Sequence, residues 1–198
     1  MLQKVSYNLG IATVSRGVIG ILSLIIVGIL TRSLGPTGFG QYSMIFAYLY
    51  IFTAVADLGL YTVMVREISR ATDHTEERSI ASKIFTMRLI TVALMIGLAD
   101  LLVFAFPYPL KIKIGILIAS LFSIGSSLVQ VLVGVFQKYL RLYFISASDI
   151  LARLIQLALL IVLAKLGAGL MWFVVVVVFS EAGHFALYNV AAMILFRD

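Results

Sequence analysis

The sequence predicts an all-α integral membrane protein that forms a bundle of six transmembrane helices. Hydrophobic residues make up 62% of its 198 residues and charged residues only 12%, and the mean hydropathy is +1.12. Soluble domains carry about 25% charged residues, so this chain has too few charges to cover a soluble surface. Six apolar stretches of about 20 residues fill the sequence. We therefore expect residues 1–198 to form a single membrane domain.

The six expected spans follow one another with short connections. They run at about Tyr7–Leu30, Gln41–Met64, Ile84–Phe106, Ile114–Gln137, Tyr143–Leu166 and Leu170–Phe196. A turn-rich link with Pro36 separates the first two spans, and a capping box at Asp73 begins the helix that leads into the third. Pro107 and Pro109 separate the third and fourth spans. The last span contains a valine-rich run that resembles a strand, but the apolar stretch around it is long enough to predict a helix.

The cations between the spans indicate the orientation of the bundle. Placing the N-terminus in the cytoplasm puts more Lys and Arg inside than outside, as the distribution rule for membrane proteins requires. The inner residues are then Lys4, Arg66, Arg70, Arg78, Lys83, Lys138, Arg141 and Arg197, and the outer ones are Arg32, Lys111, Lys113 and Lys165. We expect a multi-pass protein of the cell membrane with both termini in the cytoplasm. Because its net charge is +6, we expect the protein to interact with anionic lipid and not with nucleic acid.

The composition argues against several kinds of enzyme. The sequence has no Cys, so it offers no thiolate nucleophile and no Cys-bound metal. Its two His residues, His74 and His184, lie far apart in sequence, which argues against a zinc or di-metal site. The sequence also lacks the clustered metal ligands of a lipid-phosphate enzyme and a glycine loop followed by Lys. We expect no catalytic residue, no metal and no cofactor.

Five charged residues within the expected spans are the candidate site. An ionised side chain near the bilayer centre costs at least roughly 2.5–3.5 kcal/mol, so it usually faces a cavity or a partner. The residues are Arg16, Arg88, Arg153, Asp57 and Glu181. Arginines in a membrane cavity can replace the lost hydration of a phosphate. We expect the three arginines to line a cavity open mainly to the cytoplasm and to bind an anionic substrate. The two acids would serve as coupling or charge-balancing groups.

Three of these residues also have a structural interpretation. Arg16 and Asp57 lie at similar depths in neighbouring spans, so they could form an ion pair without any role in transport. Arg88 lies near the inner end of its span and could extend its guanidinium to the inner surface, which is the favoured interpretation for this residue.

The last two spans carry a second set of alternatives. Asp149 and Arg153 stand one turn apart and could form an i,i+4 pair along a single helix. Glu181 has no cation near it in sequence, so it is either protonated or paired with Arg153 across the last helical hairpin. His184 is expected to be a hydrogen-bonded interior residue.

Two motifs resemble the N-terminal part of the oligosaccharide lipid flippases, also called polysaccharide biosynthesis or O-antigen transport proteins. The first is Leu30-Thr-Arg-Ser-Leu-Gly-Pro-Thr-Gly-Phe-Gly-Gln-Tyr42, in which Thr37 replaces the acid usual in the family. The second is Ala56-Asp-Leu-Gly-Leu-Tyr-Thr-Val-Met-Val-Arg-Glu-Ile-Ser-Arg70. Multidrug and toxin extrusion transporters and lipid II flippases belong to the same superfamily. The remainder of the chain resembles the family in span count and loop order.

The resemblance implies a transporter that moves polyprenyl-pyrophosphate-linked sugars from the inner to the outer leaflet. Such proteins are not enzymes, carry no cofactor, and alternate between inward-open and outward-open forms of two facing six-helix bundles. Arg16 would belong to the cationic lining of the first bundle. Family members have about twice as many spans, so the chain is expected to be one half of the fold. The second six-helix half would be the rest of a longer chain, a second copy, or a separate subunit.

Two other functions stay open at this level. A multidrug or cation exporter of the same superfamily would use Asp57 and Glu181, although the three arginines argue against a cationic substrate. A membrane partner that assembles without transporting is the third possibility.

Overall fold

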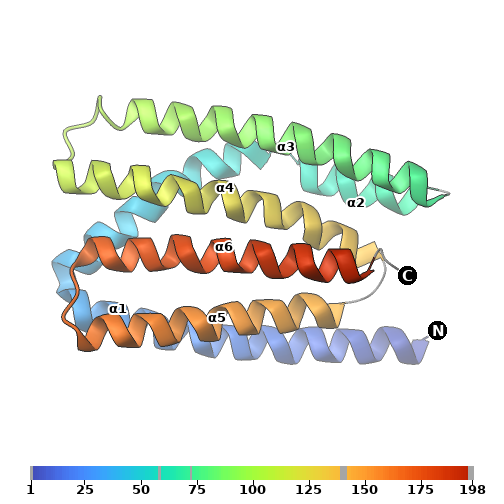
Figure 1. Cartoon of the computed structure of the whole chain (residues 1–198), viewed down its shortest axis with the longest axis horizontal. Coiled ribbons are helices and arrows are strands. Elements are labelled where there is room, and N and C mark those ends of the chain that lie inside the picture. The colour runs from blue at the N-terminus through green and yellow to red at the C-terminus, as the bar shows by residue number, and fades with distance from the viewer. Residues whose placement is uncertain (1, 58, 72, 139–141, 196–198) are drawn as a thin grey trace.

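A computed structural model describes residues 2–57, 59–71, 73–138 and 142–195 of the chain. These residues form six helices that lie along the long axis of the molecule: α1 (Leu2–Asp57), α2 (Leu60–Arg70), α3 (His74–Leu102), α4 (Leu110–Lys138), α5 (Leu142–Lys165) and α6 (Leu170–Leu195) (Figure 1). The prediction of an all-helical membrane protein is confirmed. Within the described residues, five helices are long and apolar enough to cross a membrane, and α2 is not among them.

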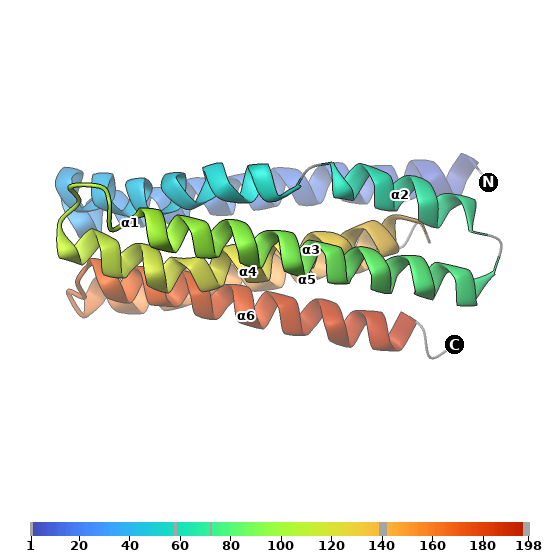
Figure 2. The same ribbon diagram turned by 90° about the horizontal axis from the view of Figure 1, so that it is seen from above.

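Helix α1 consists of two arms that run in opposite directions. Gly35 has φ 67° and ψ 176°, a conformation outside the helical region, and the chain turns back there (Figure 2). Glycine reaches this positive φ without the steric cost that a Cβ would bring. Pro36 follows directly, and its fixed φ suits the first turn of the second arm, where a missing N–H costs nothing. The predicted link between the first two spans is thus reduced to a break at one residue.

The second expected span is interrupted before its predicted end. Helix α1 ends at Asp57, and α2 begins at Leu60 after Gly59, which has a left-handed φ of 74°. The prediction of one continuous helix over Gln41–Met64 is therefore wrong, because Gly59 breaks the helical hydrogen bonding. The break leaves Asp57 at a helix end inside the bundle.

Helix α3 begins where its capping residue predicts. Asp73 accepts a hydrogen bond from the backbone N–H of Glu76 at 2.6 Å, which satisfies an N–H group of the first turn. The helix starts at His74, well before the apolar stretch that was expected to begin at Ile84. The extension is polar, so it carries α3 beyond the apolar region.

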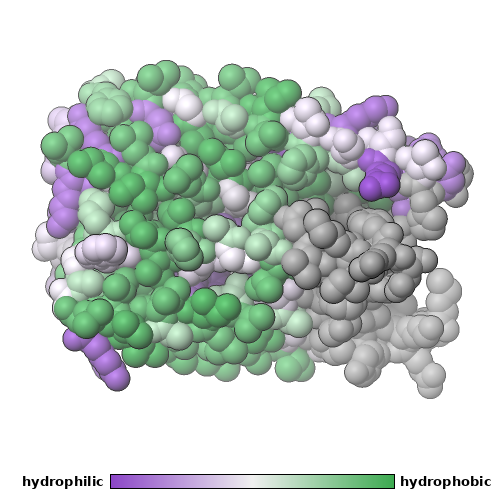
Figure 3. All heavy atoms as spheres, viewed as in Figure 1, coloured by the Kyte–Doolittle hydropathy of each residue, from purple (hydrophilic) through white to green (hydrophobic). Residues whose placement is uncertain are grey.

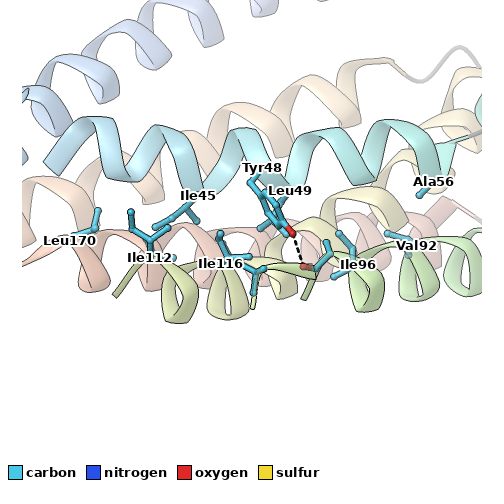
Figure 4. Close-up of a cluster of buried hydrophobic side chains, with 13 residues drawn as sticks. Ile45, Tyr48, Leu49, Ala56, Val92, Ile96, Ile112, Ile116 and Leu170 are labelled. Carbon is cyan, nitrogen blue, oxygen red and sulfur yellow. Dashed lines mark hydrogen bonds between the residues drawn. The ribbon is translucent and has the colours of Figure 1, made fainter. Parts of the chain in front are cut away.

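The main core joins the second arm of α1 to α3, α4 and α6. Ile45 and Leu49 pack against residues of the other three helices, among them Ile96, Ile116 and Leu170 (Figure 4). The Tyr48 hydroxyl donates to the backbone carbonyl oxygen of Ala99 at 2.7 Å, so its buried polar end is satisfied. The core therefore ties α3 and α4 against the arm that carries Asp57.

A second core holds the first arm of α1 to α5 and α6. Ile26 and Leu30 pack with Leu160 and Phe173, all of them 5% exposed or less. The outer faces of the helices are apolar as well: Leu24, Leu101 and Phe179 are more than 70% exposed. Figure 3 shows this apolar surface as a broad band with hydrophilic groups gathered toward its ends. Such a surface is matched by lipid and not by water.

Candidate functional site

Two adjoining cavities lie among the described helices. The Arg153 cavity has a volume of about 420 Å³ and is lined mainly by the second arm of α1, α4, α5 and α6. The Arg88 cavity has a volume of about 590 Å³ and is lined by the second arm of α1, α3 and α4. Phe46, Phe122 and Ser126 line both cavities. Both volumes fall within the roughly 300–1,000 Å³ typical of small-molecule sites.

The Arg88 cavity contains an arginine tied to two other helices. Arg88 is 3% exposed, and its Nη1 donates to Oδ1 of Asp57 at the end of α1. Its Nη2 donates to Oε1 of Gln130 on α4 at 3.0 Å. Its buried Nε has no hydrogen-bond partner among the described residues. The expectation that Arg88 extends to the inner surface is wrong, because Asp57 and Gln130 hold its guanidinium inside the bundle.

Hydroxyl groups complete the lining of the Arg88 cavity. Ser123, Ser126, Ser127 and Thr53 line it together with Arg88. The three serines and Gln130 recur on α4 at intervals of three and four residues, so they lie on one face of that helix. This face supplies neutral hydrogen-bonding groups beside the guanidinium.

The Arg153 cavity contains both cationic and anionic groups. Arg153 Nη1 donates to Oε1 of Gln156 on the same helix at 3.0 Å. Asp149 Oδ1 lies 2.9 Å from His184 Nε2 and accepts a hydrogen bond from the Tyr188 hydroxyl at 2.8 Å, so α5 and α6 are joined by a polar contact. The i,i+4 pair of Asp149 with Arg153, one of the alternatives from the sequence, is not the contact observed, because Arg153 donates to Gln156 and Asp149 contacts side chains of α6.

Glu181 faces the same cavity from α6. Its Oε2 lies 3.8 Å from Nδ1 of His184, which is the ion-pair contact the structure gives for Glu181. Pairing with Arg153, one of the two alternatives for Glu181, is not the contact observed, since Arg153 donates to Gln156. His184 is an interior residue with polar partners, as expected, and its two ring nitrogens face two carboxylates.

Arg16 lies apart from the two cavities. It is on the first arm of α1, its side chain is exposed, and it lines neither cavity. The ion pair that Arg16 and Asp57 could have formed is not observed, because Asp57 pairs with Arg88. The structure thus brings Arg88 together with Asp57, and Arg153 together with Glu181, around adjoining spaces. The role of Arg16 in a binding site stays a prediction.

Neutral polar residues were missed by the search for charges. Gln130 and Gln156 each accept a hydrogen bond from an intramembrane arginine. Their signal was present in the sequence as amides within otherwise apolar helices. The spacing of Ser123, Ser126, Ser127 and Gln130 was also visible in the sequence, and it is typical of residues on one face of a helix.

The described side chains of the site offer hydrogen-bonding groups and charges of both signs. Among the described residues, no group of three or more His, Cys, Asp or Glu is arranged to hold a metal ion. Arg88 supplies a buried donor with an unused N–H, and Arg153 supplies further donors near two carboxylates. The arrangement is suited to binding a polar ligand within an apolar bundle.

The chain matches the model of one protein family over residues 5–197, and the family is described as polysaccharide biosynthesis protein. The match covers nearly the whole sequence. No curated protein and no solved structure matches the chain.

Proposed function

The chain belongs to the polysaccharide biosynthesis protein family, and from that premise we propose that it moves a polyprenyl-pyrophosphate-linked sugar from the inner to the outer leaflet of the cell membrane. The family is of transporter type and is not a known class of enzyme. In this proposal the two arms of α1 each cross the membrane, which gives six spans with both termini in the cytoplasm. The bundle is one half of the transporter.

Arg88 is the observation that carries the proposal. A buried guanidinium inside an apolar bundle is costly unless it is paired and hydrogen-bonded. Two of its nitrogens are paired, and the buried Nε has no hydrogen-bond partner among the described residues. Guanidinium groups bind phosphate oxygens strongly through parallel N–H donors. An anionic headgroup in the Arg88 cavity would lie beside this guanidinium.

Alternating access requires a second bundle against which this one can move. The partner would be the rest of a longer chain, a second copy, or a separate subunit. A bundle with polar cavities and no facing partner would expose polar groups to lipid, which is unfavourable. We therefore propose that Arg16, which is exposed on the first arm of α1, contributes to the cationic lining only when the second half is present.

A cation exporter is the competing proposal, since the Arg153 cavity contains Asp149 and Glu181. Arg153 lines the same space and would repel a cationic drug. Efflux of a cationic dye with no movement of a lipid-linked sugar would favour this competing function.

Transport in lipid vesicles tests the proposal. The native transporter would be placed in vesicles, and the movement of a fluorescent sugar-bearing polyprenyl pyrophosphate between leaflets would be followed. Arg88→Gln and Arg153→Gln should lower the rate at least tenfold, because each removes a cationic donor for the phosphate or the sugar. The control is Arg32→Gln, which removes an exposed arginine that lines neither cavity. Wild-type rates in both cavity variants, with normal insertion, would contradict the proposal.

A further inference from the structure

The Arg153 cavity differs chemically from an anion site. Asp149 and Glu181 both line it, together with Arg153 and His184, so two carboxylates share the space with one guanidinium and one imidazole. A pyrophosphate would be repelled by the two carboxylates, whereas a ligand with hydroxyl groups can both donate to carboxylates and accept from Arg153. The cavity thus favours a neutral ligand that is rich in hydroxyl groups.

The hydrogen bonds within the Arg153 cavity leave particular atoms available. Among the described residues, the contacts of Asp149 go to Oδ1, so Oδ2 keeps its capacity to accept. Gln156 accepts from Arg153 through Oε1, and its side-chain NH₂ keeps its capacity to donate. His184 and Tyr188 hold Asp149 in place, so this acceptor is preorganised. Fixed donors and acceptors of both kinds are what a polyhydroxyl ligand requires.

Aromatic rings form one wall of the same cavity. Tyr42 and Phe46 have ring centroids 4.8 Å apart, and Phe46 and Phe122 have centroids 5.5 Å apart. The ring planes of Tyr42 and Phe46 meet at 49° and those of Phe46 and Phe122 at 90°, so they form an apolar wall against which the C–H face of a sugar can pack while its hydroxyls reach the polar side.

The position of the cavity agrees with the covalent structure of the proposed substrate. The first sugar of such a lipid is bonded directly to the pyrophosphate, so a sugar subsite and a pyrophosphate subsite must share a border. The Arg153 and Arg88 cavities share Phe46, Phe122 and Ser126.

We propose that the Arg153 cavity is the subsite for the first sugar of the lipid-linked substrate and that Asp149, Glu181 and Gln156 select a neutral sugar there. The inference rests on the proposed function. The pyrophosphate occupies the Arg88 cavity, and the sugar hydroxyls bond to Asp149 Oδ2, the Glu181 carboxylate and the Gln156 amide. A uronic acid is disfavoured, because its carboxylate would lie near Asp149 and Glu181.

The test compares carriers that differ only in the sugar. The native transporter in lipid vesicles would be titrated with bare polyprenyl pyrophosphate and with the same carrier bearing one hexose, one N-acetylhexosamine or one uronic acid. The wild type should bind at least one neutral-sugar carrier about tenfold more tightly than the bare carrier. It should bind the uronic acid carrier less tightly than that neutral-sugar carrier.

Charge-neutral variants test which residues give that preference. Asp149→Asn and Glu181→Gln should each reduce, several-fold, the ratio of the affinity for the neutral-sugar carrier to the affinity for the bare carrier. Glu67→Gln is the matched control, since Glu67 lies on α2 and bonds to the exposed Arg66. If Asp149→Asn fails to fold, Glu181→Gln still decides the question, because its contact with His184 is the longer one at 3.8 Å.

The outcomes separate the inference from the function on which it rests. If the wild type binds no carrier, the proposed function itself fails. If it binds all carriers equally, or if both variants keep the wild-type preference, the sugar subsite is overturned and the proposed function stands. A changed pH dependence with equal effects on all carriers would overturn it too, because the cluster around His184 would then be a protonation site.

Discussion

The two cavities hold their arginines in different ways. Arg88 is 3% exposed and joins three helices, with Asp57 on α1 and Gln130 on α4 as its partners. Arg153 is only half-buried and bonds to Gln156 one turn away on the same helix. The comparison teaches that a charged residue bonded to several other helices helps to hold the bundle together. A charged residue bonded only within its own helix stays available to bind a ligand. We expect Arg88 to serve both stability and binding, and Arg153 mainly binding.

The largest expected effect comes from breaking the Arg88 pair. Asp57→Ala leaves a buried guanidinium without its counter-charge, which should lower the free energy of unfolding by about 3 kcal/mol. Reversible unfolding of the wild type and the variant in mild detergent would measure this change in the free energy of unfolding. The double variant Asp57→Ala/Arg88→Met should recover much of that loss, because an apolar side chain of similar length replaces the buried charge. If the changes in the free energy of unfolding of the two single variants simply add in the double variant, the two residues are not coupled.

An intermediate effect is expected at the polar contact between α5 and α6. Tyr188→Phe removes the hydroxyl that donates to Asp149, and should lower the free energy of unfolding by about 1 kcal/mol. His184 still contacts the same oxygen, so the loss should be smaller than for Asp57→Ala. The same unfolding experiment measures it, with Tyr50→Phe as a control at a 74% exposed residue. A loss equal to that of Asp57→Ala would remove the distinction between the cavities.

The smallest expected effect on stability is that of Arg153→Gln. The hydrogen bond of Arg153 is to a side chain of its own helix, so the free energy of unfolding should change by about 0.5 kcal/mol or less. Transport should nevertheless fall, as proposed above. A large loss of stability would mean that Arg153 belongs to the framework in the way that Arg88 does.

The sequence predicted the membrane class well because composition and apolar length depend on few residues. Asp73 also marked a helix cap correctly, since this signal acts locally, whereas the link predicted around Pro36 is reduced to the turn at Gly35. The break at Gly59 was missed, because a glycine within an apolar run looks like part of a helix until its φ is known.

Partners of charged residues were harder to predict than their depth. Counting residues from the ends of the expected spans placed Arg16 and Asp57 at similar depths. The rotation of each helix about its axis, however, decides which side chains meet. The structure pairs Asp57 with Arg88, from a helix that the connections alone did not single out. Asp149 likewise meets His184 and Tyr188 across a helix pair instead of its own helical neighbour.

Binding of bare polyprenyl pyrophosphate to the Arg88 variants tests the central claim most directly. The native transporter, Arg88→Lys and Arg88→Gln would each be titrated with the carrier in lipid vesicles at one salt concentration. Arg88→Gln should bind at least tenfold more weakly than the wild type, and Arg88→Lys should lie between them, because lysine keeps the charge and loses the parallel donors. Equal affinity for all three proteins, each correctly inserted, would contradict the assignment of Arg88 as the anion-binding residue.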